Sequence, residues 1–471
     1  MAEMRDGLFI DGVWRSSQAR FADVNPYSGE TLAEVAEASQ EDIGAALDAA
    51  APPAIAPYER AQVLLGARER LKARREAAIG LVVAETGFTR RDATGEFDRC
   101  LETLALSAEE AKRLAGEVVP FAGAPGGAGR WGHTRLYPVG TVVCITPFNA
   151  PLNTVAHKIA PAFAAGNAVI LKPSEKAPLS AALLVEALAE AGAPAGSLAL
   201  LHGAGAAIVP PLLADPRPGF YAFTGSTEVG RIVHRSAGLR RTQMELGSVS
   251  ATIALADADP AAVARAVAQS GYRKAGQVCT SVQILLVEAP LAPALTDALT
   301  AAVEALTHGD PSSDDTDLGP VISAAAGTRI REWVAAAEAA GARLLRGGGG
   351  GGAMVPPVLL DRVGPDMAVT CREIFGPVVS IIPVADLDEA VGRVNASPYG
   401  LATGIFTNDL ARAEHAVDRL ETGAVHVNQT SSARADLMPY GGWKDSGFGH
   451  EGPAYAIRQM SREKLVSYRT S

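Results

Sequence analysis

The chain has 471 residues, of which 48% are hydrophobic and 20% are charged. This length and balance are typical of a soluble protein with two or three globular domains. The formal net charge of −10, with no basic block in the sequence, argues against a nucleic-acid-binding protein.

The beginning of the chain, MAEMRDGLFIDGVW, lacks the basic and then apolar pattern of a secretory signal peptide. No apolar run in the sequence reaches the ~18 residues of a membrane span. The four cysteines are far apart and form no CxxC pair, which argues against a disulfide framework or a zinc site. They are Cys100, Cys144, Cys279 and Cys371. We therefore expect a cytoplasmic protein that binds no metal, membrane or nucleic acid.

Taken in chain order, the first 120 residues are predicted to be mostly helical. Apolar residues recur there at helical spacing, for example through ERAQVLLGARERLKARREAAIGLVVAETG. The later segment GRWGHTRLYPVG has the pattern of an extended arm, and SREKLVSYRTS at the end of the chain is also strand-like. We expect these two extended pieces to lie outside the main sheets and to offer edges for pairing between subunits.

From residue 138 onward, short apolar strands alternate with amphipathic helices. The strand-like stretches are VGTVVCITPFN, NAVILKPS, SLALLHG, GFYAFTGS and RTQMEL. This alternation predicts an α/β fold with a doubly wound parallel sheet, which binds ligands at the carboxyl ends of its strands. A second series of the same kind, from about residue 250 to about residue 430, predicts a second domain. Within it, the tract RGGGGGGAM is predicted to be a flexible surface loop.

One thiol lies at the junction between a basic helical run and an apolar strand. In YRKAGQVCTSVQ, Cys279 comes just before the apolar segment SVQILLVE. A cysteine at this place is either a nucleophile or a small buried apolar residue, because free cysteines are mostly buried and inert. The remaining motifs of the chain have to decide between the two.

Two turns after predicted strands contain the residues of a phosphate and ribose site. In FTGSTEVG, Gly225 permits a tight turn and Ser226 or Thr227 caps the next helix, whose exposed N–H groups favour phosphate. The alternative is that FTGSTEVG forms an ordinary capped turn between a strand and a helix. In LKPSEK, Glu175 follows a strand beside Lys172, where an acidic residue binds ribose hydroxyls and disfavours the 2′-phosphate of NADP. A solvated pair of charges is the alternative.

Three further motifs supply polar or aromatic groups next to apolar strands. Glu245 in MELGS ends a strand, and an apolar setting there raises the pKa of a carboxylate and suits it as a general base. Asn149 in TPFNAPLN, held between prolines, can donate its amide to an oxyanion together with the backbone N–H of Cys279. Glu373 and Phe375 in CREIFGPV are candidate contacts to a ribose and a nicotinamide. The alternatives are a glutamate at the rim, a structural turn asparagine and a simple loop.

Taken together, the ordered motifs PFN, KPSE, FTGSTxxG, ELG, GQxC, EIFGP and PYGGxKxSG resemble the aldehyde dehydrogenase superfamily, from about residue 8 to residue 465. The resemblance implies two Rossmann-related doubly wound parallel-sheet domains, an oligomerisation arm, and assembly as a homodimer or homotetramer. On this basis we place a dinucleotide-binding domain at residues 1–117 and 138–246 and a catalytic domain at 247–434. The oligomerisation segments are placed at 118–137 and 435–471.

The resemblance also implies a covalent oxidation of an aldehyde to its carboxylic acid with NAD, with NADP as the alternative cofactor. Cys279 would attack the aldehyde to form a thiohemiacetal, whose oxyanion Asn149 would hold. Glu245 would activate the water that hydrolyses the resulting thioester. The implied cofactor contacts are Thr146, Pro147, Lys172, Glu175, Gly225, Ser226, Glu373 and Phe375.

Within the superfamily, the chain looks most like the branch of lactaldehyde and phosphonoacetaldehyde dehydrogenases. In that branch Arg99, His157 and Arg434 fall where basic side chains face an anionic substrate tail, and a guanidinium suits a carboxylate or phosphonate. Two basic or polar positions of the branch are aliphatic here, Ile284 and Leu437. We predict a small polar or anionic aldehyde as the substrate. A surface charge for Arg99 and a satisfied helix histidine for His157 are the alternatives.

Two other functions share parts of this pattern. A CoA-acylating relative would resolve the thioester with a thiol, and the retained Glu245 argues against it. A catalytically silent member acting as a binding or structural protein is disfavoured because Cys279, Glu245 and Asn149 are all present. The family's ELGGK reads ELGSV here, which changes Ser248 and Val249 but keeps Glu245.

Overall fold

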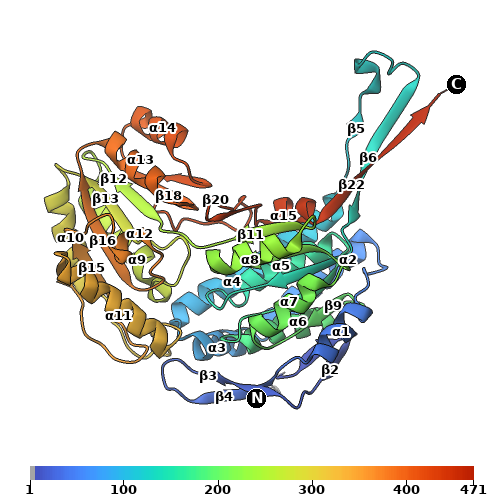
Figure 1. Cartoon of the computed structure of the whole chain (residues 1–471), viewed down its shortest axis with the longest axis horizontal. Helices are drawn as coiled ribbons and strands as arrows, with labels where there is room; N and C mark the ends of the chain where they lie inside the picture. The colour runs from blue at the N-terminus through green and yellow to red at the C-terminus, as the bar shows by residue number, and fades with distance from the viewer. Residues whose placement is uncertain (1–5, 471) are drawn as a thin grey trace.

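The computed structural model describes residues 6–470, and Figure 1 shows two bodies of sheet and helix with an arm that projects from one of them. The first body is built on an eight-stranded sheet with the order β2-β1-β9-β8-β7-β10-β11-β21. Its five central strands are parallel. They are β7 (Thr141–Ile145), β8 (Ala168–Lys172), β9 (Leu198–Leu200), β10 (Pro218–Thr224) and β11 (Arg241–Glu245).

The edges of this sheet are short antiparallel strands, β1 (Leu8–Ile10), β2 (Val13–Arg15) and β21 (Gly447–Phe448). Central strands such as TVVCI and AVILK are apolar and buried along their whole length, as expected for parallel strands covered on both faces. The predicted doubly wound α/β class is therefore confirmed.

Helices cover both faces of the eight-stranded sheet and form two separate apolar cores. One face packs against α2 (Pro57–Ala73), α3 (Arg75–Thr86), α4 (Arg90–Arg113), α5 (Asn153–Ala164) and α6 (Pro178–Glu190). The other packs against α1 (Gln40–Ala49), α7 (Gly205–Ala214) and α8 (Thr227–Ala237). In the strand order, the chain reverses direction across the sheet between β7 and β10. Ligands of such sheets bind outside the strand ends at this reversal, where the loops after β7 and β10 lie.

The second body is built on a seven-stranded sheet with the order β14-β15-β16-β13-β12-β18-β19. The strands are β12 (Ala251–Ala254), β13 (Ile284–Glu288), β14 (Arg343–Arg346), β15 (Val358–Asp361), β16 (Val378–Val384), β18 (Ala402–Phe406) and β19 (Ala424–Val427). All are parallel except the edge strand β14. The helices are α9 (Pro260–Tyr272), α10 (Ala292–Glu304), α11 (Ala324–Ala339), α12 (Ala368–Cys371), α13 (Leu387–Ala396) and α14 (Leu410–Arg419). This sheet is the second α/β series that the sequence predicts.

The projecting arm of Figure 1 is a three-stranded sheet of β5 (Val118–Val119), β6 (Arg130–Pro138) and β22 (Ser461–Arg469). The two predicted extended segments are strands, but they pair with each other over nine residues within one chain. The rings of Trp131 and Tyr468 stack across this pair with centroids 4.3 Å apart. Strand β22 lies at the edge of the arm, so its outer side has no strand partner within residues 6–470.

The beginning of the chain is less helical than the sequence predicts. Besides β1 and β2, it contains a hairpin of β3 (Arg20–Val24) and β4 (Thr31–Ala36) before the first helix. These strands are short and only partly buried, and their buried and exposed residues do not alternate regularly, so a sequence pattern does not detect them. No helix in residues 6–470 is both long and apolar enough to cross a membrane.

The remaining elements are short connections. They are β17 (Tyr399–Gly400), β20 (Trp443–Lys444), α15 (Pro453–Gln459) and the 3₁₀ turns η1 (Phe121–Gly123) and η2 (Arg273–Gly276). The glycine tract after Arg346 connects β14 to β15, and five of its six glycines have positive φ angles. This predicted loop is therefore a turn whose backbone needs glycine.

Candidate active site

Cys279 lies between η2 and β13, three residues after the tight turn formed by η2. Lys274, Ala275 and Gly276 have φ angles of 53°, 53° and 69°, all in the left-handed region. Lys274 holds this turn in place because its Nζ donates to Glu96 on α4 at 2.5 Å and to the backbone oxygen of Asn149 at 2.8 Å. The turn thus joins the loop of the nucleophile candidate to the loop after β7.

Gly276 is the position in this turn that tolerates a side chain least. Its φ is positive, and a Cβ there would overlap the backbone oxygen of Gly376. We expect Gly276→Ala to destabilise the protein by more than about 1 kcal/mol and to lower activity, because the turn that aims Cys279 must shift. The measurement is the thermal unfolding midpoint together with the turnover number.

Gly80→Ala is the matched control for Gly276→Ala. Gly80 lies in helix α3, and a Cβ there has open space. We expect this change to be neutral or stabilising, since alanine is the better helix former by about 1 kcal/mol. Unchanged stability and turnover in Gly276→Ala would show that the turn adapts to a side chain.

Cys279 is the only half-buried thiol among the described residues, since Cys100 and Cys144 are fully buried and Cys371 is exposed. Its Sγ lies 2.8 Å from the hydroxyl oxygen of Tyr440. Burial raises the pKa of the thiol to about 12, and the charge of Glu245 adds to this rise. The resting thiol is therefore protonated at neutral pH, and its ionisation needs help from neighbouring groups.

Glu245 ends β11, where its carboxylate is 2% exposed. Its Oε1 has no hydrogen-bond partner among residues 6–470. Burial raises the pKa of Glu245 well above its usual value, and the charge of Glu451 adds to the rise, whereas Lys158 and Arg434 oppose it. A buried carboxylate with a free oxygen and a raised pKa is equipped to accept a proton at neutral pH.

Asn149 lies in the loop after β7 and is partly exposed. Only its backbone oxygen is bound, by Lys274, whereas its side-chain amide makes no hydrogen bond within the described part of the chain. The amide is therefore free to donate to an oxygen atom of a ligand. The structure thus brings the loops of the three predicted catalytic residues to the meeting point of the two sheets.

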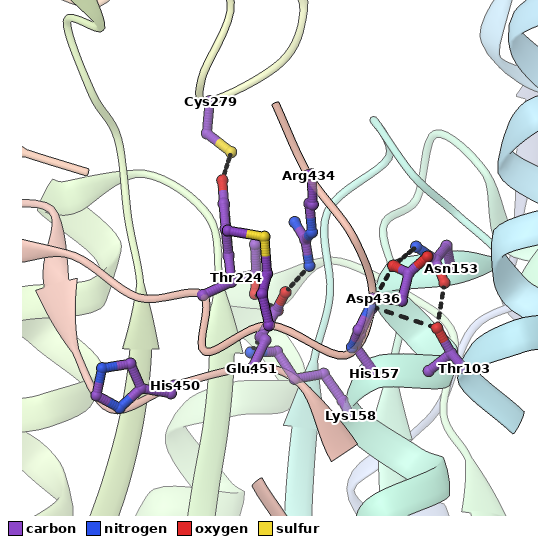
Figure 2. Close-up of polar contacts among 12 residues, drawn as sticks. Thr103, Asn153, His157, Lys158, Thr224, Cys279, Arg434, Asp436, His450 and Glu451 are labelled. Atoms are coloured by element: carbon purple, nitrogen blue, oxygen red, sulfur yellow. Dashed lines mark hydrogen bonds and ion pairs between the residues drawn. The ribbon is translucent and has the colours of Figure 1, made fainter. Parts of the chain in front are cut away.

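The buried carboxylate of Glu451 forms ion pairs with two cations near the thiol, Arg434 and Lys158. Figure 2 shows Cys279 pointing toward a cluster in which Glu451 lies between Arg434 and Lys158. Glu451 accepts from Arg434 Nη2 at 2.6 Å and from Thr224 Oγ1 at 3.2 Å, and Lys158 Nζ lies 3.0 Å from it. Burial raises the pKa of Glu451, but the neighbouring cations, Lys158 and Arg434 foremost, together outweigh this effect. The net shift of the pKa is downward, so the carboxylate stays charged.

A second carboxylate, Asp436, pairs with the other two predicted basic residues, Arg99 and His157. Arg99 donates to both of its oxygens, at 2.7 and 3.0 Å, and His157 Nε2 lies 2.8 Å from it. Asn153 also donates to Asp436, and Thr103 donates to Asn153, as the dashed lines of Figure 2 show. The predicted substrate residues Arg99, His157 and Arg434 thus lie close together, but each is bound to an internal carboxylate.

Arg273 is a basic residue near the thiol that forms no ion pair with a carboxylate among residues 6–470. Its Nη2 donates to the neutral Ser432 Oγ at 2.9 Å, and within residues 6–470 no carboxylate lies within 4.0 Å of it. Burial lowers its pKa, and the charge of Asp92 offsets part of this. It lines a cavity of about 270 Å³ whose walls also include Arg91, Arg99, Lys274, Asp92, Glu96 and Asp317.

The loops at the strand ends of the first sheet hold the predicted cofactor residues. Lys172 Nζ lies 3.1 Å from Glu175, which also accepts from the backbone N–H of Gly205 at 2.8 Å. Burial raises the pKa of Glu175, but the charge of Lys172 and the hydrogen bonds to the carboxylate together lower it more, so the net shift is downward. Ser226 caps α8, and its Oγ accepts from the N–H of Val229.

Several of these groups fit a dinucleotide. The hydroxyl of Thr146 is buried without a partner among residues 6–470, and Pro147 follows it at the strand end. Gly225 lies against the ring of Phe223, and the N–H groups at the start of α8 are oriented to receive a phosphate.

Glu373 and Phe375 face this region from the second body. Glu373 accepts from the N–H of Ser248 at 3.2 Å, and burial raises the pKa of Glu373 to about 7. The ring of Phe375 meets Phe148, in the loop after β7, edge to face with centroids 5.9 Å apart. Ser248, which replaces a family glycine, contacts Ser250 at 3.0 Å, and Ser250 donates to the backbone oxygen of Cys279.

Five residues of this site are not predicted from the sequence: Tyr440, Glu451, Asp436, Lys158 and Arg273. Their partners are far away in the chain, for example 279 positions for His157 and Asp436. Tyr440 lies within PYGGxKxSG and Arg273 within YRKAGQVCTSVQ, but neither stretch indicates a role for these two residues. For the others, the signal is the three-dimensional pairing itself.

Comparisons with known proteins agree with this geometry. The profile of the Aldehyde dehydrogenase family matches residues 14–466. A 3-sulfolactaldehyde dehydrogenase of Priestia megaterium is 42% identical over 98% of this chain and 97% of that protein.

Two solved structures have the same fold. Aldehyde dehydrogenase 21 from Physcomitrella patens, in complex with the reaction product succinate, is 35% identical with a TM-score of 0.95 over 98% of both chains. The NADP-dependent glyceraldehyde-3-phosphate dehydrogenase from Bacillus halodurans C-125, complexed with NADP, is 34% identical with a TM-score of 0.95 over 99% of both chains. The chain therefore belongs to the aldehyde dehydrogenase family and is an NAD(P)-dependent enzyme that oxidises aldehydes.

Proposed function

We propose that the enzyme oxidises a short aldehyde with an anionic tail to its carboxylic acid. The observation that carries this proposal is Arg273, a half-buried guanidinium that interacts electrostatically with Cys279, has only a neutral hydroxyl as hydrogen-bond partner and lines a cavity. Leaving a cation desolvated without a counter-ion costs free energy, which an anionic substrate would recover. Sulfolactaldehyde, named for the Priestia relative, and succinate, bound in the Physcomitrella structure, both carry an anionic group.

In the reaction we propose, the sulfur of Cys279 forms a bond to the aldehyde carbon, and the carbonyl electron pair moves onto the oxygen. The free amide of Asn149 and the backbone N–H of Cys279 stabilise that oxyanion. Glu245 then takes a proton from the water that hydrolyses the thioester, since its Oε1 is free and its pKa is raised. Retention of this buried base favours hydrolysis over transfer to CoA.

The cofactor supplies the acceptor for the hydride that the substrate carbon loses. We propose that Lys172 and Glu175 bind its adenosine ribose and that Gly225 and Ser226, at the start of α8, bind its pyrophosphate. Glu373, Phe375, Thr146 and Pro147 would hold the nicotinamide end. Because Glu175 is charged at neutral pH, we expect NAD to be preferred over NADP.

The test of the substrate class is Arg273→Gln, which removes the charge but keeps a donor for Ser432. With 3-sulfolactaldehyde or succinate semialdehyde, kcat/KM should fall on the order of 100-fold, the usual loss of a charge-assisted hydrogen bond. With the neutral lactaldehyde and propanal, it should change less than about threefold. The measurement is reduced nicotinamide formed over this panel of aldehydes.

Arg91→Gln is the matched control, because Arg91 lines the same cavity but is paired with Asp317 at 3.0 Å. It should leave the ratio between anionic and neutral aldehydes unchanged. Equal losses for both classes in Arg273→Gln would contradict the proposed anion site. A wild-type preference for neutral aldehydes would do the same and would leave the oxidation itself in place.

We also propose that the enzyme is a homodimer or homotetramer in which the arm contacts another copy. The free outer edge of β22 supports this, since an unpaired strand edge is a natural site for pairing.

A further inference from the structure

The hydroxyl of Tyr440 makes a contact that the mechanism above does not use. It lies 2.8 Å from the Sγ of Cys279, and neither atom has another hydrogen-bond partner within residues 6–470. Tyr440 is 3% exposed and belongs to the segment between β19 and β20. The hydroxyl therefore lies in direct contact with the atom that would attack the substrate.

The position of this hydroxyl is fixed by packing. The guanidinium of Arg434 stacks on the Tyr440 ring, with its carbon 3.8 Å from the ring centroid. Arg434 is in turn held by Glu451 at 2.6 Å, and Glu451 by Lys158 at 3.0 Å. A ring held by a paired guanidinium keeps its hydroxyl on the sulfur.

The direction of the hydrogen bond follows from the acidities of the two groups. Burial raises the pKa of Tyr440 well above its usual value, and the charges of Cys279 and Glu245 add to the rise. Burial raises the pKa of Cys279 to about 12. Since the tyrosine keeps its proton, it is the donor whenever the sulfur is a thiolate.

The other charged groups near the sulfur do not replace this donor. Glu245 and Glu373 raise the pKa of the thiol through their negative charge, whereas Arg434 lowers it without bonding to the sulfur. Tyr440 is the one group among the described residues whose side chain lies within hydrogen-bond distance of the sulfur.

We propose that Tyr440 is a catalytic residue whose hydroxyl donates a hydrogen bond to the Cys279 thiolate and so favours the ionised nucleophile. In the step that it assists, the S–H bond breaks, the proton leaves to water and the sulfur keeps the electron pair. Tyr440 keeps its own proton throughout. This inference rests on the proposed role of Cys279 as the nucleophile.

The test is Tyr440→Phe, which keeps the ring on Arg434 and removes only the hydroxyl. Losing a hydrogen bond to a charged group raises the pKa of Cys279 further and lowers the thiolate fraction at fixed pH by about 10- to 100-fold. A less acidic thiol is also a better nucleophile once ionised, and this offsets about half of the loss in rate on a logarithmic scale. We therefore expect iodoacetamide to label Cys279 about 3- to 10-fold more slowly at fixed pH below 10.

Labelling is followed by mass spectrometry of the Cys279 peptide in the full-length enzyme without substrate. The exposed Cys371 is the internal reference, and its labelling rate should not change. Tyr221→Phe is the matched control, because Tyr221 also loses a buried hydroxyl, bonded to the backbone oxygen of Leu212, but has no sulfur contact. A matching shift of the pH dependence of kcat/KM toward higher pH is expected in Tyr440→Phe alone.

Unchanged or faster labelling of Cys279 in Tyr440→Phe, with the Cys371 rate constant, would overturn the inference. The proposed role of Cys279 is tested separately, by measuring aldehyde oxidation in Cys279→Ala. If that variant still oxidises aldehydes, the nucleophile assignment fails whatever the labelling shows. If it is inactive while labelling in Tyr440→Phe is unchanged, only the role of Tyr440 fails.

Discussion

Replacing Cys279 by alanine is expected to lower kcat by more than about 10⁴-fold, because no other thiol can form the bond to the substrate. Cys100 and Cys144 are fully buried, and burial raises the pKa of both thiols. The fold should tolerate the change, since the Sγ of Cys279 makes one hydrogen bond, to Tyr440. The measurement is reduced nicotinamide formed with a preferred aldehyde, together with the thermal midpoint.

The matched control for this variant is Cys371→Ala. Cys371 ends helix α12, is exposed, and contacts only the backbone oxygen of Asp366. Its replacement should leave turnover within about twofold. Residual activity of Cys279→Ala within 100-fold of wild type would mean that the aldehyde is oxidised without a bond to this sulfur.

Replacing Glu451 by alanine is expected to cause the largest loss of stability, about 3 to 5 kcal/mol. Its carboxylate is 1% exposed and faces both Lys158 and Arg434, so its removal leaves two buried cations without a counter-charge. The measurement is the urea unfolding transition of the full chain. Glu421→Ala is the control, because Glu421 pairs with Lys444 at the surface, where an ion pair contributes little.

The same carboxylate predicts how stability depends on pH. The two cations hold the pKa of Glu451 in the folded protein below its value of about 4.3 in an unfolded chain. Its stabilising effect is therefore present above pH ~4.3 and is lost as the pH falls toward the lower, folded-state pKa. Wild type should lose stability on acidification more steeply than Glu451→Ala, and parallel curves would contradict the assignment.

Activity should respond as well, because the charge of Glu451 raises the pKa of Glu245. Without that charge the proposed base ionises at lower pH. The acid limb of the pH–rate profile of Glu451→Ala should therefore lie at lower pH than that of wild type. A limb at unchanged pH would show that Glu245 does not set it.

The sequence predicts the sheets well and the beginning of the chain poorly, for a physical reason. Strands such as TVVCI and AVILK are buried on both faces, so their composition alone identifies them. Strands β3 and β4 are only partly buried and have an irregular pattern, and they are defined by their pairing with each other rather than by apolar alternation. The arm is a similar case, since both of its long strands are recognisable as extended but their mutual pairing is not.

At the site, residue types in motifs were predictable, but partners were not. Arg273 and Lys274 are adjacent in sequence, yet Lys274 is neutralised by Glu96 and Arg273 is not. Arg99 has the residue type expected at an anion site, but Asp436, 337 positions away, binds it through two hydrogen bonds. The tertiary structure decides which cation has no carboxylate partner, so a sequence pattern cannot predict it.

The segment between β19 and β20 concentrates much of this chemistry in one connection. It carries Ser432, Arg434, Asp436 and Tyr440, and Ser431 fastens it by donating to the backbone oxygen of Thr280. Neither Cys279 nor Glu245 belongs to it. Relatives that differ in this one connection can therefore differ in several polar groups around the thiol at once, while Cys279 and Glu245 stay unchanged.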